Sequence, residues 1–372
     1  MSAAIIAALV SESEKLTLEV ETVKESKLPS IDFNNLPFGK TFSDHMMICE
    51  YYDGKWQSAK IQPYQNISVS PACNVFHYGQ AVFEGMKAYY KQDESGIVLF
   101  RPEKNLERLN KSAVRMSMPE VPEYLFMEGI KKLVELDKDF IPKKAGSSLY
   151  IRPFIIGTEP FIGVRTSDRY LFCIIIGPTG PYYGEPISVL VYDTYVRSTK
   201  GGYGNAKAAG NYAGTLYPRE LATKMGYKDV LWLDGEHKKY ANEVGTMNIF
   251  FVIDGKLVTP ETDGTILEGI TRDSVIKIAK DFGYAVEERP ISIDEIIAAH
   301  ESGKLTEMFG TGTAAVINVV NRFGYKGKDY LLDEKTFVIA QQLKEELEGI
   351  QKCKMCIRDS VIVDSLNFSK EI

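Results

Sequence analysis

The chain has 372 residues, of which 44% are hydrophobic and 25% are charged, and its formal net charge at pH 7 is -6. This length allows two domains of ordinary size, and the composition is that of a globular protein. The negative charge argues against a partner with a phosphate backbone, so we expect no binding of nucleic acid.

The N-terminal run Met1 to Val10 is apolar, but it lacks a basic leader and is too short to span a bilayer. We therefore expect a cytoplasmic protein that does not bind membranes, with a partly disordered extension over residues 1–35. Five cysteines are scattered along the chain, and this odd number is typical of a reducing compartment. Cys353 and Cys356 have metal-ligand spacing, but no histidine cluster accompanies them, so we predict no metal site.

Residues 36–176 mix strand and helix patterns and are predicted to form a small α+β domain. Turn residues at Glu94 to Gly96 separate two apolar runs, which predicts a hairpin. Pro102 suits the first turn of a helix with apolar residues at helical spacing. The predicted elements are strands over Lys87 to Tyr90 and Ile97 to Phe100, helices over Pro102 to Met118 and Tyr124 to Phe140, and strands over Leu149 to Ile156 and Tyr170 to Ile176.

A stretch dense in Gly and Pro, Gly177 to Gly184, predicts an interdomain linker over residues 177–187. Residues 188–350 are then predicted to form a larger domain, and residues 351–372 an atypical tail. Gly283 is a helix stop, and Ser292 with Glu295 three residues later predicts a helix start. The predicted elements are strands over Ser188 to Val196, Asp229 to Leu233, Asn248 to Ile253 and Lys256 to Thr259, and helices over Tyr212 to Met225, over Thr271 to Phe282 and after Ser292.

One lysine, Lys207, stands among small residues in the segment Gly201 to Tyr212, which contains four glycines. A lysine that forms an imine needs close access and removal from water, which favours the neutral, nucleophilic amine. Lys207 is therefore a candidate Schiff-base nucleophile. The alternative is a Gly-rich loop that simply turns the chain and leaves its lysine in solvent.

An imine-forming lysine in amino-acid chemistry points to pyridoxal phosphate, which requires a carboxylate for its ring nitrogen and backbone amides with a cation for its phosphate. Glu243, just before an apolar strand, is the candidate carboxylate, and its alternative is a turn residue in solvent. Gly269 to Thr271 and Gly310 to Ala314 are candidate phosphate sites, although such residues also form ordinary caps. Arg108 could add a phosphate contact or lie solvated on its helix.

Two aromatic-rich segments, His77 to Gly85 and Tyr150 to Phe154, could form an apolar pocket edged by Arg152. Apolar walls with few polar groups suit a small branched side chain. The alternative is that both segments contribute ordinary core aromatics.

Seven segments in order along the chain resemble the branched-chain amino-acid aminotransferases, which are fold-type IV pyridoxal-phosphate enzymes. They are Phe38 to Met46, His77 to Tyr89, Phe100 to Pro102, Tyr150 to Pro153 with Gly157 to Pro160, the Lys207 segment, Glu243 to Asn248, and Gly269 to Arg272. The resemblance runs from about Leu36 to Val320. It implies an α/β (α+β) fold of two domains, a barrel-like sheet in the larger one, and an active site between them.

The resemblance also implies the roles of individual residues. Lys207 would form the Schiff base with pyridoxal 5'-phosphate and move the proton at the substrate Cα, Glu243 would hold the ring nitrogen, and Tyr212 the phenolic oxygen. The implied phosphate contacts are Arg108, Ile270, Thr271 and Thr313. The implied substrate contacts are Phe38, Tyr78, Phe83, Tyr150, Arg152, Val164 and Ala314, with Arg152 assigned to the distal carboxylate of glutamate.

The implied reaction is amino transfer between leucine, isoleucine or valine and 2-oxoglutarate, in a homodimer whose loop at Ile162 to Val164 enters the neighbouring site. The alternatives are a D-amino-acid aminotransferase, an aminodeoxychorismate lyase, and an inactive pyridoxal-phosphate-binding protein. Two features depart from the resemblance. Ala315 to Asn318 stands where some relatives carry a redox Cys-x-x-Cys, and the sequence after Ile350 is unlike the family's C-terminus.

Overall fold

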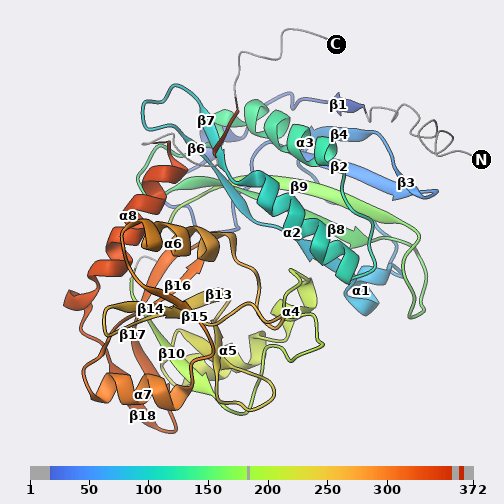
Figure 1. Ribbon diagram of the computed structural model, residues 1–372. Helices are drawn as coiled ribbons and strands as arrows, with labels where there is room; N and C mark the ends of the chain where they lie inside the picture. The colour runs from blue at the N-terminus through green and yellow to red at the C-terminus, as the bar shows by residue number, and fades with distance from the viewer. Residues whose placement is uncertain (1–16, 182–184, 354–359, 364–372) are drawn as a thin grey trace, which may run out of the picture.

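The computed structural model describes residues 17–181, 185–353 and 360–363, and its strands form two large sheets (Figure 1). The first sheet has ten strands in the order β1-β4-β2-β9-β8-β6-β7-β19, with β3 on β2 and β5 on β8. Its strands are β1 (Leu18–Val20), β2 (His45–Tyr52), β3 (Lys55–Trp56), β4 (Ala59–Pro63), β5 (Ala81–Phe83), β6 (Met86–Tyr90), β7 (Ile97–Phe100), β8 (Ser148–Gly157), β9 (Tyr170–Thr179) and β19 (Ser360–Val363).

The second sheet has nine strands in the order β12-β11-β10-β17-β16-β13-β14-β15, with β18 on β17. Because β12 also pairs with β13, the strands from β12 to β13 in this order close into a ring, and the predicted barrel-like sheet is confirmed. Its strands are β10 (Ile187–Tyr192), β11 (Asp229–Leu233), β12 (Ala241–Val244), β13 (Met247–Ile253), β14 (Lys256–Thr259), β15 (Val286–Glu288), β16 (Leu305–Gly312), β17 (Val316–Tyr325) and β18 (Lys328–Leu331).

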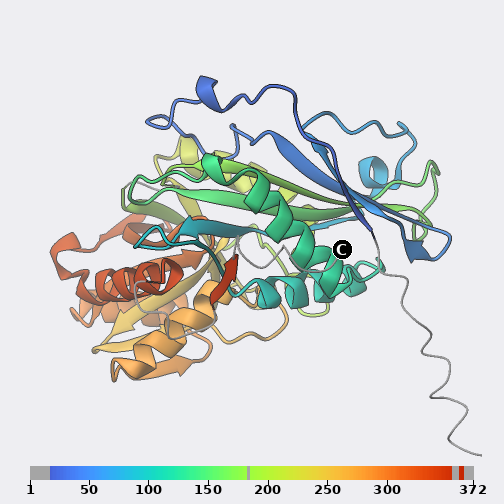
Figure 2. The same ribbon diagram turned by 90° about the horizontal axis from the view of Figure 1, so that it is seen from above.

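Helices cover both sheets, and Figure 2 shows the blue and green first sheet set apart from the orange and red elements of the second. The α-helices are α1 (Asn74–Tyr78), α2 (Pro102–Arg115), α3 (Glu123–Leu136), α4 (Ala209–Ala213), α5 (Leu216–Lys224), α6 (Ile270–Asp281), α7 (Ile293–Glu301) and α8 (Val338–Gln351). The short 3-10 helices are η1 (Leu28–Ser30), η2 (Lys138–Phe140) and η3 (Glu334–Thr336). Among the described residues, no helix is both long and apolar enough to cross a membrane.

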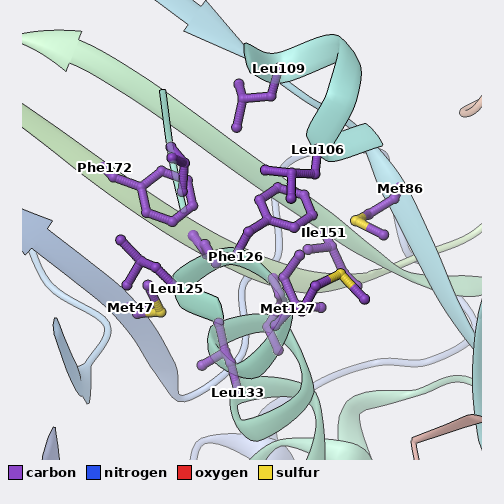
Figure 3. Packing of buried hydrophobic residues seen from close by; sticks show 14 of the residues in the cluster. Met47, Met86, Leu106, Leu109, Leu125, Phe126, Met127, Leu133, Ile151 and Phe172 are labelled. Carbon is purple, nitrogen blue, oxygen red and sulfur yellow. The ribbon is translucent and has the colours of Figure 1, made fainter. Parts of the chain in front are cut away.

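The helices α2 and α3 pack on the first sheet through one apolar core (Figure 3). Leu109 of α2 and Phe126 of α3 are fully buried against Met47 of β2 and Phe172 of β9. Burial of side chains of this size stabilises the fold by about 1.5–3 kcal/mol each. The core therefore fixes α2, which carries Arg108, against the sheet that carries the aromatic segments.

Several predicted elements are confirmed where local chemistry decides them. The two hairpins form as β6 with β7 and as β13 with β14. The helix α7 begins after Ser292, whose hydroxyl accepts a hydrogen bond from the Glu295 amide. The helix α6 is followed by Gly283 at φ 82°, the left-handed conformation that favours glycine at a helix end.

Two predicted elements need correction. The single helix predicted over Tyr212 to Met225 is broken into α4 and α5, because Pro218 has no amide hydrogen and fits only the first turn of a new helix. The strand predicted over Ser188 to Val196 ends at Tyr192, and Tyr195 turns to pack edge-on against Tyr192 and Tyr217.

The Gly-Pro stretch begins inside a strand, because β9 continues through Gly177 and Pro178 to Thr179. A side chain at Gly177 would collide with the backbone carbonyl of Thr41, so this glycine permits a close approach of two chain segments. The predicted domain division over residues 36–176 and 188–350 stays a prediction. In the tail, β19 pairs with β7, whereas Cys356 lies outside the described residues.

Candidate active site

A cavity of about 370 Å³ lies where the two sheets and α2 meet. Its walls contain most of the residues predicted for the site. They are Phe38, Phe83, Arg108, Tyr150, Arg152, Lys207, Tyr212, Glu243, Ile270, Thr271, Thr313 and Ala314. Residues from well-separated stretches of sequence thus meet around one space large enough for a small-molecule ligand.

The backbone of Lys207 is held from two sides. Its amide donates to the Ser112 hydroxyl on α2 at 2.9 Å, and its carbonyl accepts from the Phe83 amide on β5 at 3.0 Å. The side chain is half-buried, and its Nζ lies 3.1 Å from the Tyr212 hydroxyl and 5.1 Å from the Phe83 ring centroid. The amine therefore faces the cavity, and the alternative of a loop lysine in solvent is wrong.

Glu243 lies on β12 opposite Asn248 on β13, and its side chain is almost fully buried. It forms an ion pair with Arg197 and accepts a hydrogen bond from the Asn248 side-chain amide at 3.2 Å. Burial raises the pKa of Glu243 above its ordinary value, although the Arg197 charge opposes this shift. The alternative of a turn residue in solvent is wrong, and Arg197 is a site residue that our sequence analysis missed.

Two chain turns line the cavity beside Arg108. The helix α6 begins at Ile270 after Gly269, with no side-chain cap on its first amides. A Cβ at Gly269 would collide with Oδ1 of Asn248, so the chain approaches β13 closely here. The second turn, at Thr313 to Ala315, joins β16 to β17. Both candidate phosphate segments therefore reach the cavity, where the amides of a helix start favour an anion.

Arg108 is buried, so the solvated alternative for this arginine is wrong. Its Nε and Nη2 donate to the Glu84 carboxylate at 2.7 and 2.9 Å, and its Nη1 donates to the Glu268 carbonyl at 3.1 Å. Glu84 also accepts from Asn105 at 2.7 Å. Burial opposes the ionisation of Glu84, but Arg108 outweighs it and holds the pKa of this carboxyl below its ordinary value.

Glu84 was missed by our sequence analysis. The signal available was one acidic residue inside the apolar run from Ala81 to Met86, where a buried carboxylate needs a cationic partner.

The aromatic end of the cavity contains Arg152 within a ring of side chains. The Arg152 Nη2 donates to the Tyr150 hydroxyl at 3.0 Å, and its guanidinium carbon lies 4.7 Å from the Phe83 ring centroid. The Phe38 ring meets Tyr150 edge-on at 4.8 Å. The Arg152 Nε is buried without a hydrogen-bond partner among the described residues. This end therefore combines apolar walls with one cation that has unused donor capacity.

Two predicted site residues lie away from the cavity. Tyr78, at the end of α1, is 38% exposed, and Val164 is 89% exposed in the loop between β8 and β9. The same loop exposes Phe161 and Ile162. A single copy of the chain therefore does not bring Tyr78 or Val164 to the site.

The chain matches known proteins over most of its length. A profile described as "Amino-transferase class IV" matches residues 81–323. "Branched-chain-amino-acid aminotransferase 2" of Bacillus subtilis (strain 168) is 50% identical over 343 residues, which cover 91% of this chain and 94% of that protein.

Solved structures that share the fold include two branched-chain aminotransferases. The branched-chain aminotransferase of Thermoproteus uzoniensis, solved with norvaline, has a TM-score of 0.71 at 27% identity and covers 86% of this chain and 100% of its own. The branched-chain amino acid aminotransferase of Escherichia coli has a TM-score of 0.66 at 25% identity and covers 86% of this chain and 99% of its own.

The fold, the lysine-containing cavity and these matches define the chain's class as a fold-type IV aminotransferase. Within that class, the chain belongs to the family of branched-chain-amino-acid aminotransferases.

Proposed function

We propose that the protein transfers the α-amino group between leucine, isoleucine or valine and 2-oxoglutarate, with pyridoxal 5'-phosphate as its cofactor. One observation carries this proposal: the Lys207 amine and the buried Glu243 carboxylate line one cavity with an uncapped helix start and an aromatic end that contains Arg152. The activity named for the Bacillus subtilis relative, at 50% identity, supports the same reaction.

The residues in the cavity fit the cofactor. Lys207 would hold it covalently, Glu243 would accept a hydrogen bond from its ring nitrogen, and Tyr212 would contact its phenolic oxygen. The phosphate would be bound by Arg108, Ile270, Thr271 and Thr313. The Thr311 hydroxyl, buried on the cavity wall without a partner among the described residues, supports a polar ligand there. When bound, the cofactor supplies an electron sink for the charge that develops at the substrate Cα.

The chain's own residues then position and move the proton. Lys207 would take and return the proton of the substrate Cα, and the hydrogen bond to Tyr212 at 3.1 Å holds its amine at the cavity wall. Burial raises the pKa of Glu243, and the charge of Arg197 opposes this rise and so favours the ionised carboxylate. Phe83 beside the amine reduces access of water, which strengthens the electrostatic interactions in the cavity.

Substrate selection follows from the aromatic end. Phe38, Phe83, Tyr150 and Ala314 would surround a branched aliphatic side chain. Arg152 would bind the distal carboxylate when glutamate or 2-oxoglutarate occupies the same space, because its Nε has no other partner among the described residues.

A homodimer in the cytoplasm completes the proposal. The exposed loop with Ile162 and Val164, 67% and 89% exposed, supports a contact with a second copy. Tyr78 and Val164 would then contact the substrate in the neighbouring subunit's site.

An amino-transfer assay tests the function. Purified protein loaded with pyridoxal 5'-phosphate is mixed with leucine and 2-oxoglutarate, and in parallel with D-alanine and 2-oxoglutarate. We expect glutamate from the leucine mixture only. Pyruvate from D-alanine without leucine turnover would instead support a D-amino-acid aminotransferase.

The variant Lys207→Ala tests the role assigned to this lysine in the same assay. Its turnover should fall by about a thousandfold or more, because the nucleophile and proton carrier is gone. Its circular dichroism spectrum should be unchanged, because the contacts that hold this segment use the Lys207 backbone. Near-normal turnover of this variant would contradict the assignment of Lys207.

A further inference from the structure

Lys87 on β6 is a buried lysine that none of the roles above uses. Its side chain is 9% exposed, and it is not part of the cavity wall. Its Nζ donates a hydrogen bond at 3.0 Å to the carbonyl of Ala314, which lies 227 residues further along the chain. In the part of the chain that the structure describes, no carboxylate forms an ion pair with Lys87, and Glu348 on α8 acts on it through its charge alone. A buried ammonium without a carboxylate is costly, so this contact is a specific feature of the fold.

The Ala314 carbonyl belongs to the turn that joins β16 to β17. Gly312, Thr313, Ala314 and Ala315 all line the cavity. The turn closes between Gly312 and Val316, which pair across the two strands. Val316 has φ 60°, a conformation that a β-branched residue rarely adopts, so this turn needs support from outside.

Lys87 gives this support from the other sheet. In the strand register, it lies opposite Tyr150, the residue that packs on Phe38 at the aromatic end of the cavity. One hydrogen bond therefore joins the sheet that carries the aromatic end to the turn that forms the facing wall.

We propose that Lys87 is a positioning residue that holds the Thr313–Ala315 turn against the cavity and so sets the affinity for the carboxylate-bearing substrates. This inference rests on the proposed function of the cavity. The substrates of amino transfer share a carboxylate on the reacting carbon. The Lys87 cation on the Ala314 carbonyl polarises the peptide unit that ends in the Ala315 amide on the cavity wall, so this amide would be a stronger donor to that carboxylate. The loss of Lys87 should therefore weaken the binding of all substrates alike. The loss of Arg152 should weaken only the binding of substrates with a distal carboxylate.

The surroundings of Lys87 supply a measurable signature. Burial lowers the pKa of Lys87 to about 8, and Glu348 on α8 opposes this shift while Lys344 and Lys352 add to it. Tyr150 is the titratable group opposite on β8. Above this pKa the amine is neutral and is a weaker donor to the Ala314 carbonyl.

The test is the binding of 4-methylpentanoate, which has the carboxylate and branched chain of leucine but no amino group and cannot be turned over. Its Kd is measured by calorimetry on protein loaded with pyridoxal 5'-phosphate, at about pH 7 and about pH 9. For Lys87→Met we expect a Kd about tenfold higher at the lower pH, since a charge-assisted hydrogen bond is lost. From about pH 7 to about pH 9, the Kd of the wild type should rise by a larger factor than the Kd of Lys87→Met.

Two further variants separate positioning from a purely structural role. Lys91→Met removes a half-buried lysine just after β6 and should leave the Kd unchanged. Lys87→Arg keeps the charge and the donor, so its Kd at the lower pH should stay within about threefold of the wild-type value. Because arginine stays charged at about pH 9, the Kd of this variant should not show the extra rise of the wild type at high pH. This variant also serves if Lys87→Met does not fold.

An unchanged Kd in Lys87→Met would overturn the proposal. So would a pH dependence that is the same in the wild type, Lys87→Met and Lys87→Arg. The measurement needs no turnover, so a failure of the proposed transaminase activity would appear in the leucine assay and not here.

Discussion

Among the described residues, several ion pairs and two further cations line or adjoin the cavity. Arg108 pairs with Glu84, Arg197 with Glu243, and Arg219 with Asp229. Among the described residues of the cavity wall, the cations without a carboxylate partner are Arg152 and Lys207. The cavity is therefore positively charged before any ligand enters, as expected for a site that accepts a phosphate and carboxylates.

The charge of Arg152 should act on one substrate class only. We expect Arg152→Gln to raise the KM for 2-oxoglutarate by about 10- to 100-fold, because a charge-assisted hydrogen bond to the distal carboxylate is lost. The KM for leucine, which has no second carboxylate, should stay within about threefold. Steady-state kinetics with each substrate varied checks this, and Lys104→Gln, which removes an exposed cation on α2, is the control. An equal rise in both KM values would contradict the assignment.

The buried pair of Glu84 and Arg108 should matter for stability. Glu84→Gln leaves the Arg108 charge buried without its partner, so we expect a loss of about 3–5 kcal/mol in the free energy of unfolding. The pKa of Glu84 lies below its ordinary value of 4.5 in the folded state, so its stabilisation is present above that pH and is lost as the pH falls below it.

Urea unfolding of the wild type and Glu84→Gln at several pH values measures this difference. The difference between the two proteins should shrink as the pH falls below about 4.5. Glu107→Gln, which breaks an exposed pair with Lys104 on the same helix, should change stability little. A similar loss in both variants would contradict the argument from burial.

At the scale of elements, the start of α6 lies close to Asn248 on β13, and its first amides have no side-chain cap. Gly269 has φ -70°, which any residue adopts, but a Cβ there would collide with Asn248. We therefore expect Gly269→Ala to shift the start of α6 and to weaken the binding of pyridoxal 5'-phosphate by about tenfold or more. Spectroscopic titration of the apoprotein measures this Kd.

The matched control is Gly96→Ala in the β6–β7 turn. A Cβ there would meet only the flexible side chain of Lys91 at 3.5 Å, so this variant should bind the cofactor normally. Normal binding by Gly269→Ala as well would show that the α6 start does not contact the phosphate.

The elements that sequence predicted correctly are those decided within a few residues. A turn of Asp254 and Gly255 specifies one hairpin, and the Ser292 cap specifies the start of α7. The break between α4 and α5 is also decided locally, by Pro218, but we interpreted this proline as part of one longer helix. Gly177 was misread because its role depends on Thr41, which is distant in sequence.

The residues of the candidate site show the same difference between features decided by nearby residues and features that depend on distant ones. Lys207 and Glu243 stand in segments whose composition is unusual by itself, and the structure brings both to the cavity. Arg197, Glu84 and Lys87 depend on partners 24 to 227 residues away. A single sequence does not reveal such pairings, because nothing near these residues specifies the partner.

At the scale of the whole molecule, one copy of the chain leaves the proposed substrate contact at Val164 in solvent. We expect Val164→Asp to convert the proposed dimer to monomers and to lower turnover, since a charge would be buried in the contact. Sedimentation analysis and the leucine assay measure both effects. Val338→Asp places the same change on a residue 56% exposed at the start of α8 and should leave assembly unchanged. A fully active monomer would contradict the proposal.

The cavity takes its walls from both sheets, and this placement has a consequence for handling the protein. A molecule bound there contacts both sheets, and only the folded chain offers the complete set of contacts. Because the molecule binds the folded state and not the unfolded one, its binding shifts the equilibrium toward the folded state. Preparations saturated with vitamin-derived cofactor should accordingly resist heat and proteases better than stripped ones, and the benefit should grow with the excess supplied.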